Sequence, residues 1–448
     1  MKKVFFVVLS LILVIPVMAQ KKLTLDDAIR IALHGNTALI KAKNQITTNH
    51  SQLKNAYGDL LPSLNASGSF NWQRINDVGG TQLDYLGNEV PVAASQTDSR
   101  NYSLSVGGGV TLFDGLANIA NINQKKENLQ AAEYNLEKQK QNIVYQTTFY
   151  FYAVLNADEL EKVREDNVKY YQKFFETVQE RNRLGSVAKA DVYTAQVQLG
   201  NAELQLIQAQ NDYENALATL LNYLSLNVLE DYQLVDPFGG SKTLDTDSYM
   251  ENFSDISAMV SAALDNRFDF KGQKLTVNSA ENGITMARSG LIPSLSGNYS
   301  YSTRAINTQD LFNRKTLSFG LTLSIPIFSN WSTENQIQFA QVTQMNAQED
   351  LAALERQIKI EVKQGYLNLV AAKKSLDVAT KTVIASEETR KINQERYNLG
   401  SGTILDVLQA DRDYYDALRN KINATYDFHA KYDELNNALG KLDTKKYE

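Results

Sequence analysis

The sequence predicts a mixed fold of long α-helices and transmembrane β-strands, built from two copies of one pattern. Three observations in the 448-residue chain support this prediction. Two long proline-free segments could each form a single helix of about 100 Å, at roughly 1.5 Å per residue. Four shorter segments alternate between apolar and small polar residues, which is typical of strands with two different faces. The second half of the chain also repeats the pattern of the first.

The chain begins with the features of a secretory signal peptide over residues 1–19. Two lysines precede an apolar run from Val4 to Val17, and Ala19 ends a small-residue cleavage site. A transmembrane helix is the alternative, but the run is short for one. The net charge of −6 becomes −8 without those lysines, which argues against a nucleic-acid partner. The chain has no cysteine, so we expect neither lipid attachment nor disulfides.

A helical pattern follows from Leu23 to about Tyr57, with a break at Gly35-Asn36. Thr24 and Asp27 have the spacing of a capping box at its start. The pattern ends before Pro62, because proline disfavours the helical conformation of the preceding residue.

Four strands are expected, at about 63–72, 102–113, 294–301 and 316–327. No Lys, Arg, Asp or Glu occurs within these segments. Lipid on one face and water on the other explain this composition, although an ordinary aromatic sheet face is the alternative. The side chains expected to face lipid include Phe70, Trp72, Leu104, Tyr299, Phe319, Leu321 and Leu323. Long loops, Gln73 to Asn101 and Ser302 to Lys315, are expected to join the paired strands.

Four strands cannot close a membrane barrel, which needs about eight, so several chains must contribute. The strand count alone permits two, three or four subunits.

The segment from Gly115 to Leu184 predicts one continuous helix, and Thr333 to Leu399 predicts its counterpart. Each carries apolar residues at the seven-residue spacing of a coiled-coil seam. The two seams are formed by Leu129, Leu136, Ile143 and Tyr150, and by Val362, Leu369, Leu376 and Val383. A single solvated coiled coil is the alternative, but it leaves the four strands unexplained.

Each long helix ends in a copy of one short motif. RNRLGSVAKADVYTA occupies Arg181 to Ala195, and RYNLGSGTILDVLQA occupies Arg396 to Ala410, at a constant offset of 215 residues. A glycine in each can end the first helix in the left-handed conformation. Ser186 or Thr403 can cap the next helix, and an aspartate then suits its positive N-terminal dipole. Each copy is therefore expected to be the tip of a helical hairpin.

The repeat also predicts the organisation of the chain. After the signal, residues 20–226 form the first structural repeat, 227–254 a connector in an equatorial region, and 255–448 the second repeat. Pro237-Phe238-Gly239-Gly240 marks the centre of the connector.

The duplicated RYxxGxxxxxDVLxA pattern resembles the periplasmic tip motif of the TolC-like outer membrane efflux proteins. This resemblance covers nearly the whole chain after the signal. It implies a homotrimer, in which a barrel of twelve strands, four per chain, is continued by a long periplasmic α-helical coiled-coil tunnel. It also implies a passive outer-membrane duct of a tripartite efflux or type I secretion system, with no catalytic role and no cofactor.

The partners implied by the resemblance are outer-membrane lipid, a periplasmic adaptor (membrane fusion protein) and an inner-membrane transporter. The adaptor would dock on the hairpin tips, at Leu184, Gly185, Ser186, Leu399, Gly400 and Ser401. Alternatively, the glycines serve only to end their helices.

The family also places a periplasmic gate at these tips. By resemblance the gate residues are Tyr397, Asp406, Asp191, Arg396 and Gln409. Two positions depart from the family pattern, because Gly402 replaces an arginine and Gln409 replaces a second aspartate. Tyr397 and Arg396 then remain as partners for Asp191 across subunits. The alternative is that both aspartates only stabilise helix N-termini.

The three histidines, His34, His50 and His429, lie in unrelated elements, so neither a metal site nor histidine-dependent catalysis is expected. A second function class is a non-channel periplasmic coiled-coil protein, such as the adaptor itself. An adaptor would show a single helical hairpin flanked by lipoyl-like half-motifs, and the sequence shows neither feature.

Overall fold

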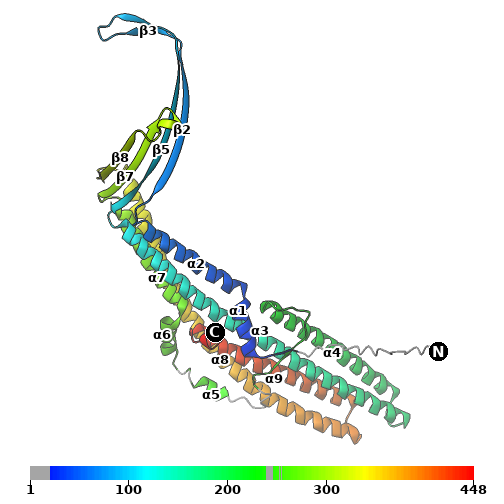
Figure 1. Cartoon of the computed structure of the whole chain (residues 1–448). Coiled ribbons are helices and arrows are strands. Elements are labelled where there is room, and N and C mark those ends of the chain that lie inside the picture. The colour runs from blue at the N-terminus through cyan, green and yellow to red at the C-terminus, as the bar shows by residue number, and fades with distance from the viewer. Residues whose placement is uncertain (1–20, 239–245, 252, 254, 448) are drawn as a thin grey trace, which may run out of the picture. The chain divides into compact units, whose positions relative to one another are not determined.

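The computed structural model describes residues 21–238, 246–251, 253 and 255–447 (Figure 1). The expected signal peptide and part of the expected connector lie outside the described residues. The first half contains β1 (Lys21–Leu23), α1 (Leu25–Gly35), α2 (Thr37–Gly58), β2 (Asn65–Asp77), β3 (Gly80–Leu83), β4 (Glu89–Val92), β5 (Ser95–Phe113), α3 (Ala117–Arg183) and α4 (Lys189–Tyr223). Next come β6 (Tyr232–Leu234), α5 (Thr246–Met250), α6 (Ile256–Asn266), α7 (Phe268–Ser289), β7 (Ser294–Ala305), η1 (Thr308–Asp310), β8 (Lys315–Ser324), α8 (Ser332–Asn398), α9 (Ile404–Ala438) and η2 (Lys445–Tyr447).

Corresponding helices of the two halves have equal lengths. α1 and α6 each have 11 residues, and α2 and α7 each have 22. α3 and α8 each have 67 residues, and α4 and α9 each have 35. The two longest helices begin and end within two residues of the ends expected from the sequence.

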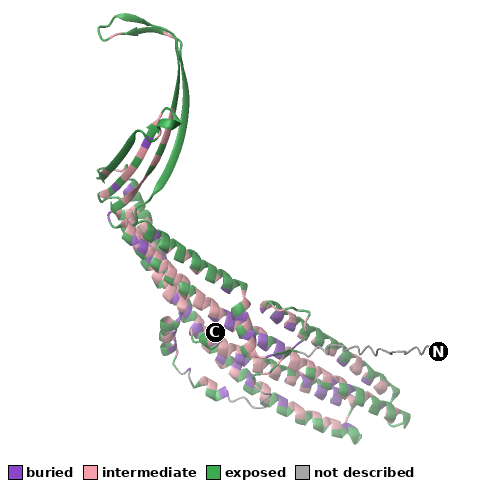
Figure 2. Cartoon of the chain, in the orientation of Figure 1, coloured by how far each residue is buried: buried purple, intermediate pink, exposed green. Residues whose placement is uncertain are grey.

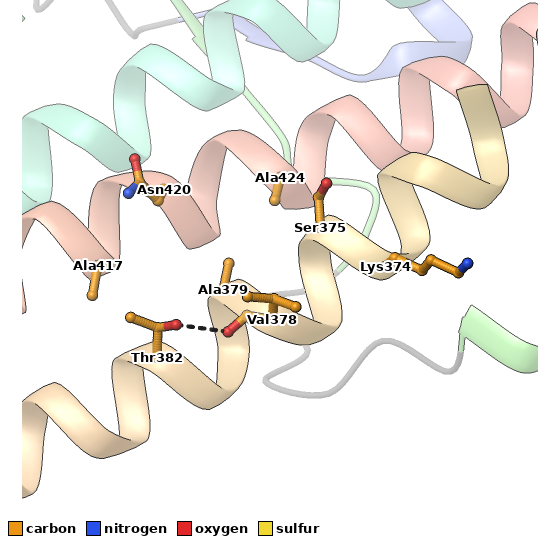
Figure 3. Close-up of a pocket in the computed structure, with 8 residues that line it drawn as sticks. All are labelled: Lys374, Ser375, Val378, Ala379, Thr382, Ala417, Asn420 and Ala424. Carbon is orange, nitrogen blue, oxygen red and sulfur yellow. Dashed lines mark hydrogen bonds between the residues drawn. The ribbon is translucent and has the colours of Figure 1, made fainter. Parts of the chain in front are cut away.

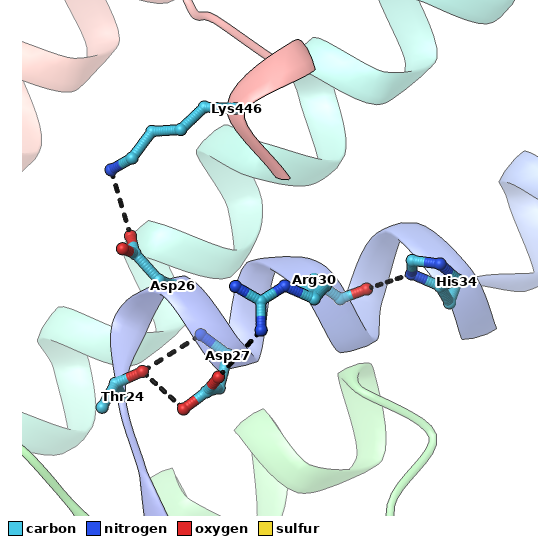
Figure 4. A network of polar contacts seen from close by, with 6 residues as sticks. All are labelled: Thr24, Asp26, Asp27, Arg30, His34 and Lys446. Atoms are coloured by element: carbon cyan, nitrogen blue, oxygen red, sulfur yellow. Dashed lines mark hydrogen bonds and ion pairs between the residues drawn. The ribbon is translucent and has the colours of Figure 1, made fainter. Parts of the chain in front are cut away.

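The first helix, α1, begins after Thr24, whose side chain caps it (Figure 4). The Thr24 hydroxyl accepts a hydrogen bond from the backbone N–H of Asp27 at 3.1 Å. It also donates to the Asp27 carboxylate at 2.6 Å, and Arg30 lies 3.2 Å from the same carboxylate. At the other end of the chain, Lys446 of η2 reaches Asp26 of α1 at 3.4 Å.

The chain divides into two compact units, and each takes residues from both halves. One unit contains the described residues of 1–41, 137–267 and 357–448. It is mainly helical and includes both hairpin tips. The other contains 42–136 and 268–356, and it includes the four-stranded sheet.

The sheet is antiparallel, with the strand order β2-β5-β7-β8. Its register brings the apolar residues of neighbouring strands together, since Phe70 lies opposite Tyr102 and Tyr299 lies opposite Phe319. The other face carries small polar side chains, and the hydroxyls of Ser67 and Ser105 are 2.7 Å apart there. The period-two alternation in the sequence therefore produces one apolar and one polar face.

The apolar face is largely uncovered in the single chain. β2 is exposed along its whole length and β8 along nearly all of it (Figure 2). Tyr299 is only half-buried, and its hydroxyl donates to the Ser63 carbonyl at 2.6 Å. The exposed side chains on this face include Phe70 (58%), Trp72 (50%), Leu104 (39%), Phe319 (77%), Leu321 (73%) and Leu323 (61%).

The expected loop from Gln73 to Asn101 is wrong, because most of this segment is β-structure. β2 and β5 stay paired as far as Asp77 opposite Ser95, and β3 and β4 form a separate hairpin beyond them. Arg74 and Asp98 form a cross-strand ion pair at 2.6 Å. Both faces are exposed here, so polar residues are tolerated and no apolar alternation marks the strands.

Two further strand boundaries differ from the expected ones. β7 continues to Ala305, four residues beyond the expected end, because its pairing with β5 extends that far. β8 stops at Ser324, two residues before Pro326, rather than at Ile327. Proline lacks the N–H that would continue the ladder and restricts the residue before it.

The core of the helical unit follows the expected seam of α8. Val362 and Leu369 are fully buried, and Leu376 and Val383 are at least nine-tenths buried. In the same unit, β6 from the connector pairs in parallel with β1, a strand that the sequence pattern did not indicate.

Within the described residues, none of the helices is both long enough and apolar enough to cross a membrane.

Candidate functional site

Both hairpin tips have the same backbone turn. Gly185 and Gly400 have φ angles of +78° and +75°, which favour glycine. In the first tip, the N–H of Ser186 donates to the carbonyl of Arg181 at 2.8 Å, and the N–H of Gly185 donates to that of Asn182 at 2.9 Å. The second tip repeats both bonds at equivalent positions. These are the two bonds of a Schellman motif, so the expected glycine caps are confirmed.

The helices that leave the tips begin differently. At the second tip, the Thr403 hydroxyl accepts from the N–H of Asp406 at 3.2 Å, and the Asp406 carboxylate accepts from the N–H of Thr403 at 2.9 Å. These bonds complete a capping box and hold the pKa of Asp406 below its usual value. At the first tip the cap position is Ala188, which makes no side-chain bond. The expectation that Ser186 caps this helix is wrong, because α4 begins three residues later.

The tips also present the side chains suggested for adaptor docking. Leu184 is 64% exposed and Leu399 is 83% exposed, while both glycines and the serines that follow them are exposed. No atom lies within 4 Å of where a Cβ would stand on Gly185 or Gly400. Both turns therefore have open space in the single chain.

Tyr397 is buried between the two hairpins rather than exposed at a tip. Its side chain is packed near Phe174, and the Arg181 guanidinium lies 5.1 Å from its ring centre. Arg181 also donates to the side chain of Asn398 at 2.9 Å. Among the described residues, the Tyr397 hydroxyl has no hydrogen-bond partner. Burial raises its pKa, Arg181 opposes that shift, and Asp191 adds to it.

Asp191, on α4, is partly exposed and acts on Tyr397 electrostatically. The other gate candidates belong to the second tip. Arg396, Asp406 and Gln409 are all exposed. The Gln409 side chain donates to Asp413 at 2.7 Å. Within one chain Arg181, and not Arg396, is the cation beside Tyr397.

A buried ion pair, which the sequence patterns did not predict, joins α8 to α9 above the second tip. Asp411 is fully buried, and its carboxylate accepts from Arg390 Nε at 2.6 Å. The Arg390 guanidinium also lies 4.2 Å from the ring centre of Tyr170 on α3. Gln394 donates to the Tyr170 hydroxyl at 2.9 Å. Burial raises the pKa of Asp411, whereas its hydrogen-bonding neighbours lower it.

A sequence signal for this pair exists, although it is weak. Asp411 follows Val407 and Leu408 on the apolar face of its helix. A carboxylate at such a position needs a cationic partner when it is buried. The period of the helix does not identify that partner, which lies 21 residues earlier on α8.

A groove of about 450 Å³ runs between α8 and α9 (Figure 3). Small side chains form much of its lining, and Lys374 stands at one end. The lining residues are Lys374, Ser375, Val378, Ala379, Thr382, Ala417, Asn420 and Ala424.

The histidines occupy unrelated positions. His429 is buried and stacks on Phe238 with 3.7 Å between ring centres, whereas His34 Nδ1 lies 2.8 Å from the Arg30 carbonyl. In the part of the chain that the structure describes, no three His, Asp or Glu side chains are grouped so that they could hold a metal.

Comparison with known proteins matches this architecture. Residues 28–225 and 259–441 match the sequence model of the family described as outer membrane efflux protein. The chain is 24% identical to the outer membrane protein TolC of Escherichia coli, over 94% of this chain and 87% of that protein. It is 26% identical to TolC of Vibrio cholerae, over 68% of each chain.

Solved structures show the same fold at lower identity. The Campylobacter jejuni outer membrane channel CmeC superposes with a TM-score of 0.76 at 18% identity, covering 94% of this chain and 88% of that one. The Vibrio cholerae outer membrane protein VceC superposes with a TM-score of 0.76 at 16% identity, covering 93% of this chain and 96% of that one. The family match spans well over half of the sequence, so the chain belongs to the outer membrane efflux protein family and is an outer-membrane efflux channel.

Proposed function

We propose that three copies of this chain form one continuous exit duct, with a twelve-stranded barrel in the outer membrane and a helical tunnel in the periplasm. The observation that carries this proposal is the exposed apolar face of the sheet, which would be covered by lipid in a barrel. β2 and β8 are the two edge strands, and each has one neighbour in the single chain. Pairing these edges between copies would close the barrel without leaving an open edge.

Charge placed on the two sheet faces tests this arrangement. Leu321→Arg should cost about 2 to 4 kcal/mol and reduce the amount of assembled protein in the outer membrane, because it places a cation in lipid. Ser318→Lys, on the polar face of the same strand, is the matched control and should be milder. Equal tolerance of both substitutions would contradict the barrel.

Cysteine pairs on the edge strands test the subunit number. The natural chain has no cysteine, so any crosslink between β2 and β8 must come from the introduced pair. Oxidation should give dimers and trimers in the outer membrane. If the largest crosslinked product contained two or four chains, the trimer would be wrong.

We also propose that the two halves, 20–226 and 255–448, are equivalent structural repeats joined by the connector at 227–254. The equal lengths of their corresponding helices support this organisation. The expected equatorial position of the connector remains part of the same proposal.

This duct would be the passive outer-membrane exit of a tripartite efflux or type I secretion system. The hairpin tips would dock a periplasmic adaptor that an inner-membrane transporter engages. Exposed Leu184 and Leu399, beside turns with open space around their glycines, support this docking. Gly400→Trp should leave the trimer intact but abolish adaptor crosslinking and efflux. Normal efflux would show instead that the glycine only ends its helix.

The gate is proposed at Tyr397, Asp191 and Asp406. Tyr397 lies beside Arg181, and Asp191 contributes to the shift of its pKa, so these side chains are grouped at the tips, which supports the proposal. Tyr397→Phe combined with Asp191→Ala should raise the open probability in planar bilayers, and Asp406→Asn should weaken cation preference. If only thermal stability changed, these residues would be structural and the constriction would lie elsewhere.

A further inference from the structure

A polar pocket with a volume of about 770 Å³ lies among α3, α4 and α9, above the hairpin tips. Its α3 wall is formed by Arg164, Asn167 and Tyr171, which have the spacing of one helix face. α9 adds Arg412 and Arg419.

The pocket carries an excess of positive charge. Three arginines line it but only one carboxylate, that of Asp416, which pairs with Arg419 at 3.4 Å. Arg412 donates to the side-chain carbonyl of Gln409, a neutral group. Arg164 forms no ion pair with any residue that the structure describes.

Arg164 is also partly withdrawn from water. Its pKa is lowered by burial and by the positive charge of Arg419. A guanidinium in this position is stabilised by an anion that forms charge-assisted hydrogen bonds with it. Asp416 attracts Arg164 and opposes this shift, but its carboxylate is paired with Arg419.

A second observation, independent of charge, also indicates a ligand. Asn167 is 95% buried, and its Oδ1 atom has no hydrogen-bond partner among the described residues. Buried polar groups are normally paired, so an unpaired amide oxygen in a residue that lines the pocket is unusual. This oxygen is closed to solvent, so a ligand in the pocket reaches the amide oxygen only after the side chain turns. The oxygen and nitrogen of an amide can be exchanged by a flip, so this side chain can offer either a donor or an acceptor.

The floor of the pocket is apolar. Tyr171, Ala202 and Leu408 form a buried cluster there, with Val168, Leu199 and Ile404 packed against it. This cluster has little surface open to the pocket, but Leu204 and Leu405 also line it and are 66% and 68% exposed. An aromatic or aliphatic group attached to an anion would cover these two side chains, which a bare inorganic ion would leave without contact.

We propose that this pocket binds a small organic anion, whose carboxylate or similar acidic group lies between Arg164 and Arg412 and whose apolar part contacts Leu204 and Leu405. Binding itself does not depend on the proposed duct. Only the role of this anion as exported cargo rests on that proposed function.

Binding of benzoate to the purified full-length protein tests the proposal. Calorimetry should show that benzoate binds more tightly than benzylammonium, which has similar size and opposite charge, and more tightly than inorganic phosphate. Arg164→Gln should weaken benzoate binding about tenfold, because one charge-assisted contact is lost. Asp416→Asn should strengthen it about threefold, because this change frees Arg419. An increase in affinity cannot be caused by misfolding.

Lys169→Gln is the matched control, since it removes one positive charge from an exposed position on the same helix, outside the pocket. It should leave benzoate binding unchanged. Equal binding of benzoate and benzylammonium, tighter binding of phosphate, or wild-type affinity in Arg164→Gln would each overturn the proposal. So would the absence of benzoate binding by every variant.

Ion conductance of the unmodified protein in planar bilayers is measured separately. A protein that conducts but does not bind benzoate overturns this inference alone. A protein that binds benzoate but does not conduct overturns the duct.

Discussion

The hairpins α3–α4 and α8–α9 have the same helix lengths and the same glycine turn, but they differ in what is buried between their helices. At the offset of 215 residues, Asp411 corresponds to Gln196, which is exposed, and Arg390 corresponds to Phe175. The buried His429 corresponds to Glu214, which is exposed. The duplicated sequence thus preserves the backbone, while charged and titratable groups are buried at these positions in the second hairpin alone.

This difference shows that two segments can share a backbone and still respond differently to substitution and pH. The turn depends on local bonds that any sequence with the right glycine can make. The buried groups depend on partners in other helices, such as Tyr170 of α3 beside Arg390. The second hairpin should therefore be the more sensitive of the two.

The largest difference is expected for Asp411→Ala. Its removal leaves the charge of Arg390 without a carboxylate in a largely buried position, which should cost about 3 to 5 kcal/mol of stability. Gln196→Ala, the equivalent change in the first hairpin, should cost less than about 0.5 kcal/mol. Thermal unfolding of the purified variants measures both. Similar losses would show that the ion pair does not distinguish the hairpins.

A pH dependence should follow from His429. Burial lowers its pKa to about 4, so the folded protein holds the neutral ring. Its contribution to stability is complete above the unfolded value of about 6.5 and is lost as the pH falls towards 4, by about 3 kcal/mol in total. His429→Phe preserves a ring against Phe238 and removes this loss.

The measurement is the difference in stability between His429→Phe and the unmodified protein at pH 7 and at pH 4. Asp433 lies in the same unit, and burial raises its pKa to about 6, so its own contribution is lost as the pH rises. Both proteins contain Asp433, so this opposite effect cancels in the difference. Glu214→Gln is the control in the first hairpin. A constant difference across this pH range would refute the assignment to His429.

The smallest effect concerns the helix starts. Thr403→Ala removes the capping box of α9 and should cost about 1 kcal/mol. Ala188→Thr, at the equivalent position of α4, should gain a similar amount, because Asp191 already stands three residues later. Opposite shifts in melting temperature would show that the cap is a transferable difference. A loss in both variants would show that tertiary contacts dominate at the first tip.

Much of this fold follows from local patterns in the sequence. Glycine at positive φ marks both tips, and the α8 seam becomes the core because its spacing keeps Val362 and Leu369 on one face. The extensions of β2 and β5 were missed because water contacts both of their faces, so alternation is not required there. The cap at Ser186 was misplaced because the sequence does not show at which residue the chain re-enters the helix.

The candidate site was less predictable, for a different physical reason. The helical period shows which side of a helix is buried, but not which residue of another helix it meets. Arg390 and Asp411, and likewise Arg181 and Tyr397, lie on different helices, so their contacts depend on the relative positions of those helices.

Because β5 lies beside β7, the sheet can be completed only when strands from both halves of the chain are present. β5 pairs with β7, and Tyr102 lies opposite Ala305 across a long stretch of intervening sequence. Such non-local pairing is slow, because the entropy of closing the loop is lost before the contacts form. β2 and β5 precede β7 and β8 in the chain, so their apolar residues are synthesised before the strands that complete the sheet. Until β7 pairs with β5, this incomplete apolar surface favours aggregation.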